Sequence, residues 1–152
     1  MGNQENIWLR LRNCLFVIEY KSIDDLKKYI EAIKSVGINI NECSILAIVE
    51  SKKEKRLLPE EANVVFLSQQ EFNFLGTLKN EQAKKLFSQT FDLQFYTVDP
   101  PRRIAKLLNK MKKKMSVGVN CATSTQNVNL KTDVNTPHHL INFAKQTLEK
   151  IV

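Results

Sequence analysis

The sequence predicts an α/β fold, a three-layer Rossmann-like or flavodoxin-like sandwich with a mostly parallel sheet of about five strands. Short, continuously apolar runs, typical of strands buried on both faces, are separated along the chain by amphipathic helical segments. Gly and Pro are scarce, with four of each, which argues against a long flexible linker. We therefore expect a single α/β domain over residues 1–152.

The first elements are a strand and a helix. The run CLFVIE, residues 14–19, is short and apolar and predicts a buried strand. A helix is expected to follow, because Ser22 can cap it and Asp25 three residues later completes a capping-box pattern. Apolar residues then recur at helical spacing until Gly37, where we expect the helix to end.

Two further strands and an aromatic corner come next. Residues 43–50 and 63–68 are apolar runs separated by a charged loop. Phe72, Phe74 and Leu75 then come just before Gly76, and we interpret this stretch as a tight apolar corner.

The second half of the chain repeats the alternation of helix and strand. The expected elements are, in order, residues 80–87, 91–98, 102–114 and 115–120. Asp99 is a natural N-cap for the second of these helices, since the two prolines after it lie where a missing N–H costs least. A polar segment follows, with a candidate short strand at NVNL, residues 127–130. Thr136 and Pro137 then open a terminal helix.

The charge of the chain is concentrated in one segment. There are 23 Lys and Arg against 16 Asp and Glu, which gives a net charge of +7. Seven of the cations lie between Arg102 and Lys114, a stretch without acidic residues, so the rest of the chain is balanced. Such asymmetry indicates an anionic partner, either an acidic protein or the phosphates of a nucleic acid.

Within this segment the apolar residues fall on one helical face and the cations elsewhere on the cylinder. The side chains that we expect to bind an anion or partner are Arg102, Arg103, Lys106, Lys110 and Lys113. A possible second contact is the aromatic pair Phe72 and Phe74. The alternative interpretation is an ordinary solvated face whose cations match the helix dipole. The cationic strip itself holds no aromatic residue that could stack on bases, which disfavours sequence-specific RNA recognition.

No residue makes a convincing catalytic group. Asp99 fits a helix cap better than a general acid or base, and Asp92, within a strand, fits a structural hydrogen bond. Cys121 would need a nearby base to act as a nucleophile. His138 and His139 are adjacent, so on a helix they diverge and cannot hold one metal ion together.

Cofactor and membrane signals are missing from the sequence as well. It contains neither G-x-G-x-x-G nor G-x-x-x-x-G-K-[ST], so we expect no cofactor and no metal. The three cysteines suit reduced thiols, and we expect a cytoplasmic protein. No apolar stretch approaches the roughly 20 residues that a membrane span needs.

Three patches of sequence carry a family resemblance: VVFLSQQEFNFLGTLKN, FDLQFYTV and MSVGVN. They contain an F-N-aromatic-x-G corner, an F-D-L strand and a V-G strand preceded by lysines, followed by a terminal helix. In this order the chain resembles a small bacterial family known only as a domain of unknown function. The matching residues are Phe72, Asn73, Phe74, Gly76, Phe91, Asp92, Leu93, Val117 and Gly118.

The resemblance covers nearly the whole chain and departs at Gln94 and Tyr96, where more apolar residues are expected. It implies a layout similar to one half of a two-domain glycosyltransferase of the heptosyltransferase kind. It implies a fold and brings no activity and no catalytic residue.

The sequence thus favours a non-enzymatic binding or interaction module whose cationic helix faces an anionic partner. Two alternatives from other classes stay open. One is a degenerate glycosyltransferase-like enzyme that uses the strand-end loops around Asp99 and Asn120. The other is a component of a ribonucleoprotein that contacts RNA phosphates without reading sequence.

Overall fold

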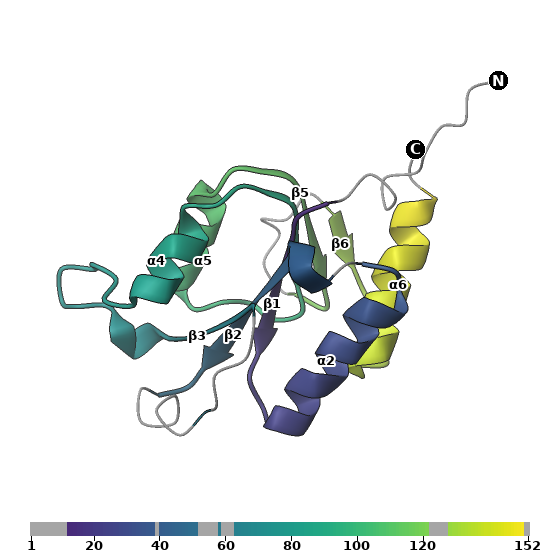
Figure 1. The fold of residues 1–152 in the computed structure, drawn as a ribbon, viewed down its shortest axis with the longest axis horizontal. Helices are drawn as coiled ribbons and strands as arrows, with labels where there is room; N and C mark the ends of the chain where they lie inside the picture. Colours follow the sequence, from purple (N-terminus) through teal and green to yellow (C-terminus); the bar gives the residue numbers. More distant parts are fainter. Residues whose placement is uncertain (1–11, 39, 52–57, 59–62, 122–127, 151–152) are drawn as a thin grey trace.

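The computed structural model describes residues 12–38, 40–51, 58, 63–121 and 128–150. At its centre lies a six-stranded sheet in which all neighbouring strands are parallel (Figure 1). The strands are β1 (Cys14–Glu19), β2 (Cys43–Val49), β3 (Val64–Ser68), β4 (Phe91–Tyr96), β5 (Lys113–Val119) and β6 (Val128–Leu130). Their order is β3-β2-β1-β4-β5-β6, which is that of Rossmann-like folds and differs from the flavodoxin-like order. The α/β prediction is confirmed, and the candidate NVNL segment supplies the sixth strand.

Helices cover both faces of this sheet. The α-helices are α2 (Ile23–Ser35), α4 (Glu81–Phe87), α5 (Arg102–Lys110) and α6 (Pro137–Glu149), and the 3-10 turns are η1 (Ile40–Glu42) and η2 (Gln69–Glu71). In Figure 1, α2 and α6 lie side by side on one face, and α4 and α5 lie on the other. None of the described helices is long and apolar enough to cross a bilayer.

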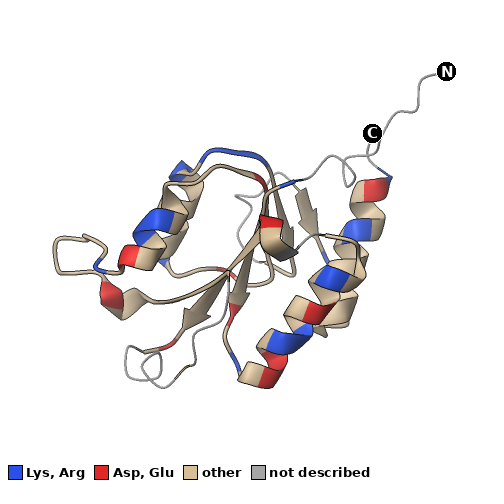
Figure 2. Cartoon of the chain, viewed as in Figure 1, with Lys and Arg blue, Asp and Glu red and all other residues tan. Residues whose placement is uncertain are grey.

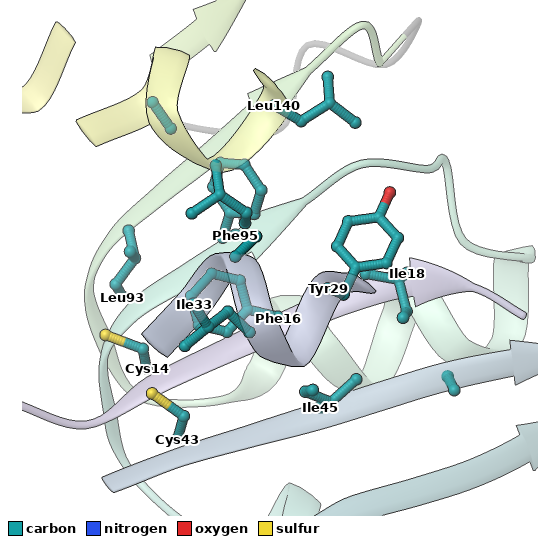
Figure 3. Packing of buried hydrophobic residues seen from close by; sticks show 14 of the residues in the cluster. Cys14, Phe16, Ile18, Tyr29, Ile33, Cys43, Ile45, Leu93, Phe95 and Leu140 are labelled. Carbon is teal, nitrogen blue, oxygen red and sulfur yellow. The ribbon is translucent and has the colours of Figure 1, made fainter. Parts of the chain in front are cut away.

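Each face of the sheet has its own buried core, because neighbouring residues of a strand point to opposite sides. From β1, Phe16 and Ile18 pack toward α2 and α6, whereas Leu15 and Val17 pack toward α4 and α5. Figure 3 shows the first core, where the rings of Phe16 and Phe95 lie 5.5 Å apart. Burial of each such side chain contributes about 1.5–3 kcal/mol, so β1, buried on both faces, anchors the domain.

The predicted helix ends of α2 and α6 are confirmed. The Ser22 hydroxyl accepts a hydrogen bond from the Asp25 N–H at 3.1 Å, and Gly37 adopts a left-handed φ of +85° just beyond α2. At α6, Thr136 occupies the N-cap position and Pro137 the first turn.

The predicted cap of α5 is wrong. Its N-cap is Pro101, which makes no side-chain cap hydrogen bond, and the helix starts at Arg102. The physical reason lies in the two consecutive prolines, because a residue that precedes proline is held in an extended conformation. Asp99 and Pro100 therefore cannot enter the helix, and Asp99 lies too early to cap it.

The predicted extent of α5 is wrong as well, since the helix ends at Lys110 and not at Lys114. Met111 is extended, with ψ of 145°, and leads directly into β5. The carbonyl oxygen of Leu108 accepts hydrogen bonds from the buried Gln94 amide at 3.2 Å and from the Lys113 ammonium at 3.4 Å. Together with the Met111 N–H, which donates to the same oxygen at 3.2 Å, these side chains replace the partner that a longer helix would have provided.

Lys113 is consequently a structural residue at the end of α5. Its ammonium also donates to the carbonyl oxygens of Asn109 and Met111, both at 3.3 Å. Desolvation by burial lowers the pKa of Lys113. Because α5 ends before Lys113, the expectation that this side chain belongs to the same helix as Lys106 and Lys110 is not met.

Asp92 has the structural role that its place in a strand predicted. Its carboxylate accepts a hydrogen bond from the Arg12 N–H at 2.8 Å and lies 3.4 Å from the Lys114 ammonium. Desolvation raises the pKa of Asp92, but the Arg12 N–H and Lys114 outweigh it, so the pKa lies below its usual value. Asp92 and Lys114 thus fasten the start of β4 to that of β5.

We predict that Asp92→Asn destabilises the protein at neutral pH by about 1 kcal/mol, because the neutral amide makes a weaker pair of contacts. The folded pKa of Asp92 is depressed, so its contribution is present above the unfolded pKa of about 3.9 and is lost as the pH falls through the folded value. Urea unfolding of both proteins between neutral and acid pH should therefore show curves that converge in acid. The exposed Asp133→Asn is the control, and a gap that does not change with pH would contradict this account.

We predict that Gln94→Leu costs about 2 kcal/mol, because the buried Tyr96 hydroxyl, which donates to the Gln94 carbonyl oxygen, loses its acceptor. Gln94→Leu combined with Tyr96→Phe should recover about half of that loss, since it removes both partners together. The measurement is a double-mutant cycle in urea. A strictly additive cycle would show that the two side chains are not coupled.

Candidate functional site

An open groove lies between α5 and the loop that follows η2. Its volume is about 390 Å³. The residues that line it are Phe72, Leu75, Gly76, Arg102, Arg103, Lys106, Leu107 and Lys110. We call this hollow the α5 groove, residues 72–77 the corner, and Arg102, Arg103, Lys106 and Lys110 the cationic face. The predicted cationic helix and the predicted aromatic corner are thus two walls of one concave surface.

Asn73 builds the corner by hydrogen bonds to the backbone of the loop. Its side-chain oxygen accepts from the N–H groups of Leu75 at 3.0 Å and Thr77 at 2.9 Å. Its main-chain oxygen accepts from the Gly76 N–H at 2.9 Å. Gly76 has a φ of +86°, a left-handed conformation that glycine adopts at little cost. The F-N-aromatic-x-G motif is therefore a turn with a fixed shape.

The corner separates its apolar side chains into a buried one and two exposed ones. Phe72 is 9% exposed and belongs to the core beneath α4 and α5. Phe74 and Leu75 are 89% and 76% exposed, so the prediction of a tight apolar corner holds for Phe72 alone. Within the described ranges, the other exposed large apolar side chain is Val134, at 46%, so the exposed apolar surface is concentrated at the tip of this loop.

Arg103 joins the corner to the helix. Its guanidinium donates a hydrogen bond to the main-chain oxygen of Asn73 at 3.2 Å, across 30 positions of sequence. This oxygen also accepts from the Gly76 N–H, so the Arg103 contact ends on a hydrogen-bonded part of the turn. Arg103 thus fixes the position of the corner relative to α5.

The remaining three members of the cationic face point toward solvent. Arg102, Lys106 and Lys110 are exposed and follow one another at intervals of four residues. In the described part of the chain, no Asp or Glu forms an ion pair with any of them. Like charges at this spacing repel one another by a few tenths of a kcal/mol per pair, which an anion in the groove would relieve.

The structure brings together four of the five cations expected at the site. Lys113 lies apart at the end of α5, and Lys114 is paired with Asp92. Figure 2 shows the loop from α5 to β5 in blue, whereas α2 carries both red and blue segments. The positive charge of the surface is therefore concentrated around α5 and its C-terminal loop.

A second hollow, of about 480 Å³, lies at the carboxyl ends of the strands. We call it the strand-end crevice, and its lining residues are Glu19, Tyr20, Ile48, Val49, Glu50, Gln69, Val98, Asp99 and Pro101. It lies where the strand order reverses between β1 and β4, the usual place for ligands in open α/β sheets. Among the residues that the structure describes, the lining contains three carboxylates and no Lys or Arg, a charge that opposes the binding of phosphates.

The candidate nucleophile Cys121 and one of the two histidines, His139, make structural contacts. The thiol of Cys121 is half-buried and lies 3.7 Å from the main-chain oxygen of Tyr96. Desolvation, with a further effect from the charge of Asp99, raises the pKa of Cys121 to about 11, so the reactive thiolate is scarce at neutral pH. His139 shares a hydrogen bond with the Thr132 hydroxyl at 2.8 Å and stacks on Phe143. Within the described ranges, no cluster of three or more His, Cys, Asp or Glu side chains could hold a metal ion.

Three residues in and around the α5 groove were not predicted as site residues, although Leu75 belongs to the predicted apolar corner. Asn73 orders the corner, Leu75 forms its exposed wall, and Leu107 contributes apolar surface from the helix. The signal for Asn73 was present, since Asn followed by Gly three residues later is typical of a turn. Leu107 carried no comparable signal, because an apolar residue on an amphipathic helix is ordinarily assigned to the core.

Comparison with known proteins gives a family whose function is unknown. A family described as "Family of unknown function (DUF6913)" matches residues 3–151, which is nearly the whole chain. No curated protein matches the sequence.

We predict that Asn73→Ala loosens the corner, because the N–H groups of Leu75 and Thr77 lose their shared acceptor. The expected cost is about 1 kcal/mol of stability, with amide exchange at both positions faster by at least about tenfold. Asn73→Asp keeps the acceptor oxygen and should retain protection. The measurement is hydrogen exchange by NMR, and unchanged exchange in Asn73→Ala would contradict the assigned role.

Proposed function

The chain belongs to the family of unknown function DUF6913, and we propose that it acts as a non-enzymatic binding module that holds an anionic partner. The proposed surface is the cationic face together with the corner. One observation carries the proposal: four cations and the exposed Leu75 line a single groove. A helical face that is only solvated would not require an exposed apolar residue beside its cations.

Long-range attraction is the expected contribution of the cationic face. Exposed charges of one sign raise the local concentration of an oppositely charged partner and speed its association. Salt screens this attraction, with a Debye length near 10 Å at 0.1 M ionic strength. The apolar tip is insensitive to salt and would contribute short-range contacts after encounter.

A second candidate function is a degenerate glycosyltransferase-like enzyme, and the strand-end crevice is the observation that favours it. Its position matches the ligand-binding edge of Rossmann-like sheets, and the sequence resembles a family with the layout of half a heptosyltransferase-type enzyme. Against it, the diphosphate of a nucleotide sugar would meet Glu19, Glu50 and Asp99. A nucleotide sugar at a hundred times its Kd would add about 2.7 kcal/mol of stability, so a thermal-shift screen without any shift would remove this candidate.

We predict that reversal of three charges, Arg102→Glu with Lys106→Glu and Lys110→Glu, abolishes capture of anionic partners. Arg103 is left intact because it positions the corner. The wild-type protein, immobilised and exposed to an extract of its native cell, should retain partners that are released as salt rises. The triple variant should bind them at least about tenfold more weakly at low salt.

The matched control is Lys27→Glu with Lys28→Glu and Lys34→Glu on α2, which makes the same change in net charge on the opposite layer. This control should keep the partners of the wild-type protein. If both variants lose their partners equally, the effect comes from net charge and not from the α5 surface. If the α5 variant retains all partners, the proposed surface is refuted. Circular dichroism and thermal unfolding establish that both variants are folded.

A further inference from the structure

The α5 groove combines an apolar lining with a charged rim. Phe72, Leu75 and Leu107 supply the apolar surface, and the cationic face supplies the charge. A partner that is only anionic would leave this apolar surface in water. A partner that is only apolar would leave the charges of α5 uncompensated.

The shape of the groove distinguishes between classes of anionic partner. Bases of single-stranded nucleic acid stack on flat, exposed aromatic faces. The aromatic residue that lines the groove, Phe72, is only 9% exposed and offers no flat, open face. The exposed Phe74 is not among the lining residues. A volume of about 390 Å³ suits an inserted apolar side chain with its neighbours, at the lower end of the range for ligand pockets, roughly 300–1,000 Å³.

The spacing of the cations fits a polypeptide. Arg102, Lys106 and Lys110 lie four residues apart on one helix, which places successive Cα atoms about 6 Å apart along its axis. Carboxylates on alternate residues of an extended segment recur at about 6.6–6.8 Å, and those four apart on a helix at about 6 Å. An acidic segment lying along α5 would therefore meet each cation in turn.

The exposed tip gives such a segment its second contact. Phe74 and Leu75 are adjacent, largely exposed and held in place by the Asn73 turn, so little ordering is needed when a partner covers them. Apolar side chains placed beside charges of one sign are typical of surfaces that bind a protein segment, where an apolar anchor gives affinity and charges give orientation.

We propose that the occupant of the α5 groove is an acidic protein segment that inserts an apolar side chain between the corner and α5 while its carboxylates face Arg102, Lys106 and Lys110. This inference rests on the proposed function and names its partner class. A nucleic acid and an anionic bilayer are the competing occupants, and the experiment includes both.

The probes are fluorescent twelve-residue peptides with six Asp or Glu residues around a central pair that is Leu-Phe, Ile-Leu, Trp-Leu or Ser-Ser. Further probes are a Leu-Phe peptide with Asn and Gln in place of the acids, an oligouridylate of equal charge, and vesicles of phosphatidylglycerol with phosphatidylcholine. Anisotropy gives Kd for the peptides and the oligouridylate, and co-sedimentation reports on the vesicles. At least one acidic-apolar peptide should bind about tenfold more tightly than the Ser-Ser peptide, the uncharged peptide and the oligouridylate.

Two variants locate the binding. Phe74→Ser with Leu75→Ser should weaken the acidic-apolar peptide about tenfold and leave the Ser-Ser peptide unchanged, because both side chains are exposed and their removal spares the core. Val134→Ser, at another exposed apolar residue, is the control and should change nothing. Reversal of Arg102, Lys106 and Lys110 should weaken every anionic probe.

The outcomes separate a failure of the peptide inference from a failure of the proposed function. Absence of binding by every acidic-apolar peptide, equal binding of the Ser-Ser peptide, or preference for the oligouridylate or vesicles would overturn the peptide inference. If the oligouridylate or the vesicles bind, and this binding depends on Arg102, Lys106 and Lys110, the proposed function is still supported. Probe binding that survives the charge reversal would overturn both.

Discussion

The proposed surface depends on where α5 ends. The Gln94 amide and the Lys113 ammonium both donate to the Leu108 carbonyl oxygen, and the chain then turns through Met111 into β5. This termination keeps the exposed cations of the helix within nine residues, opposite the corner. It also removes Lys113 from the set that can face a partner. A buried polar contact on the inner side of the helix therefore determines which charges are available on its outer side.

The α5 groove and the strand-end crevice have opposite chemistry. The α5 groove is bordered by cations and apolar side chains, whereas the strand-end crevice contains three carboxylates at the position where Rossmann-like folds usually bind phosphate-bearing ligands. The fold thus supplies the usual crevice, but among the described residues its lining is acidic and the cationic face lies beside α5. Function in this chain is better argued from the site than from the fold.

Most of the fold was predictable from local patterns, because β1 matches its predicted bounds and Ser22 caps α2 as expected. The misses at α5 have tertiary causes. The stretch from Met111 to Lys114 continues a helical pattern, and only the contacts from β4 and β5 stop it. Consecutive prolines displaced Asp99 from the cap. The cations of the site could be predicted from charge, but the groove could not, since Asn73 and Arg103 meet only after α4 and α5 reach the same face of the sheet.

The central claim is that the corner and the cationic face act as one surface. Its most direct test is a photo-crosslinking residue, benzoylphenylalanine, placed at Leu75 or, for comparison, at the exposed Lys28 of α2. The account predicts that an acidic-apolar peptide crosslinks from Leu75 and not from Lys28, and that reversal of Arg102, Lys106 and Lys110 abolishes the product. Equal crosslinking from both positions, or a Leu75 product that survives the charge reversal, would contradict it.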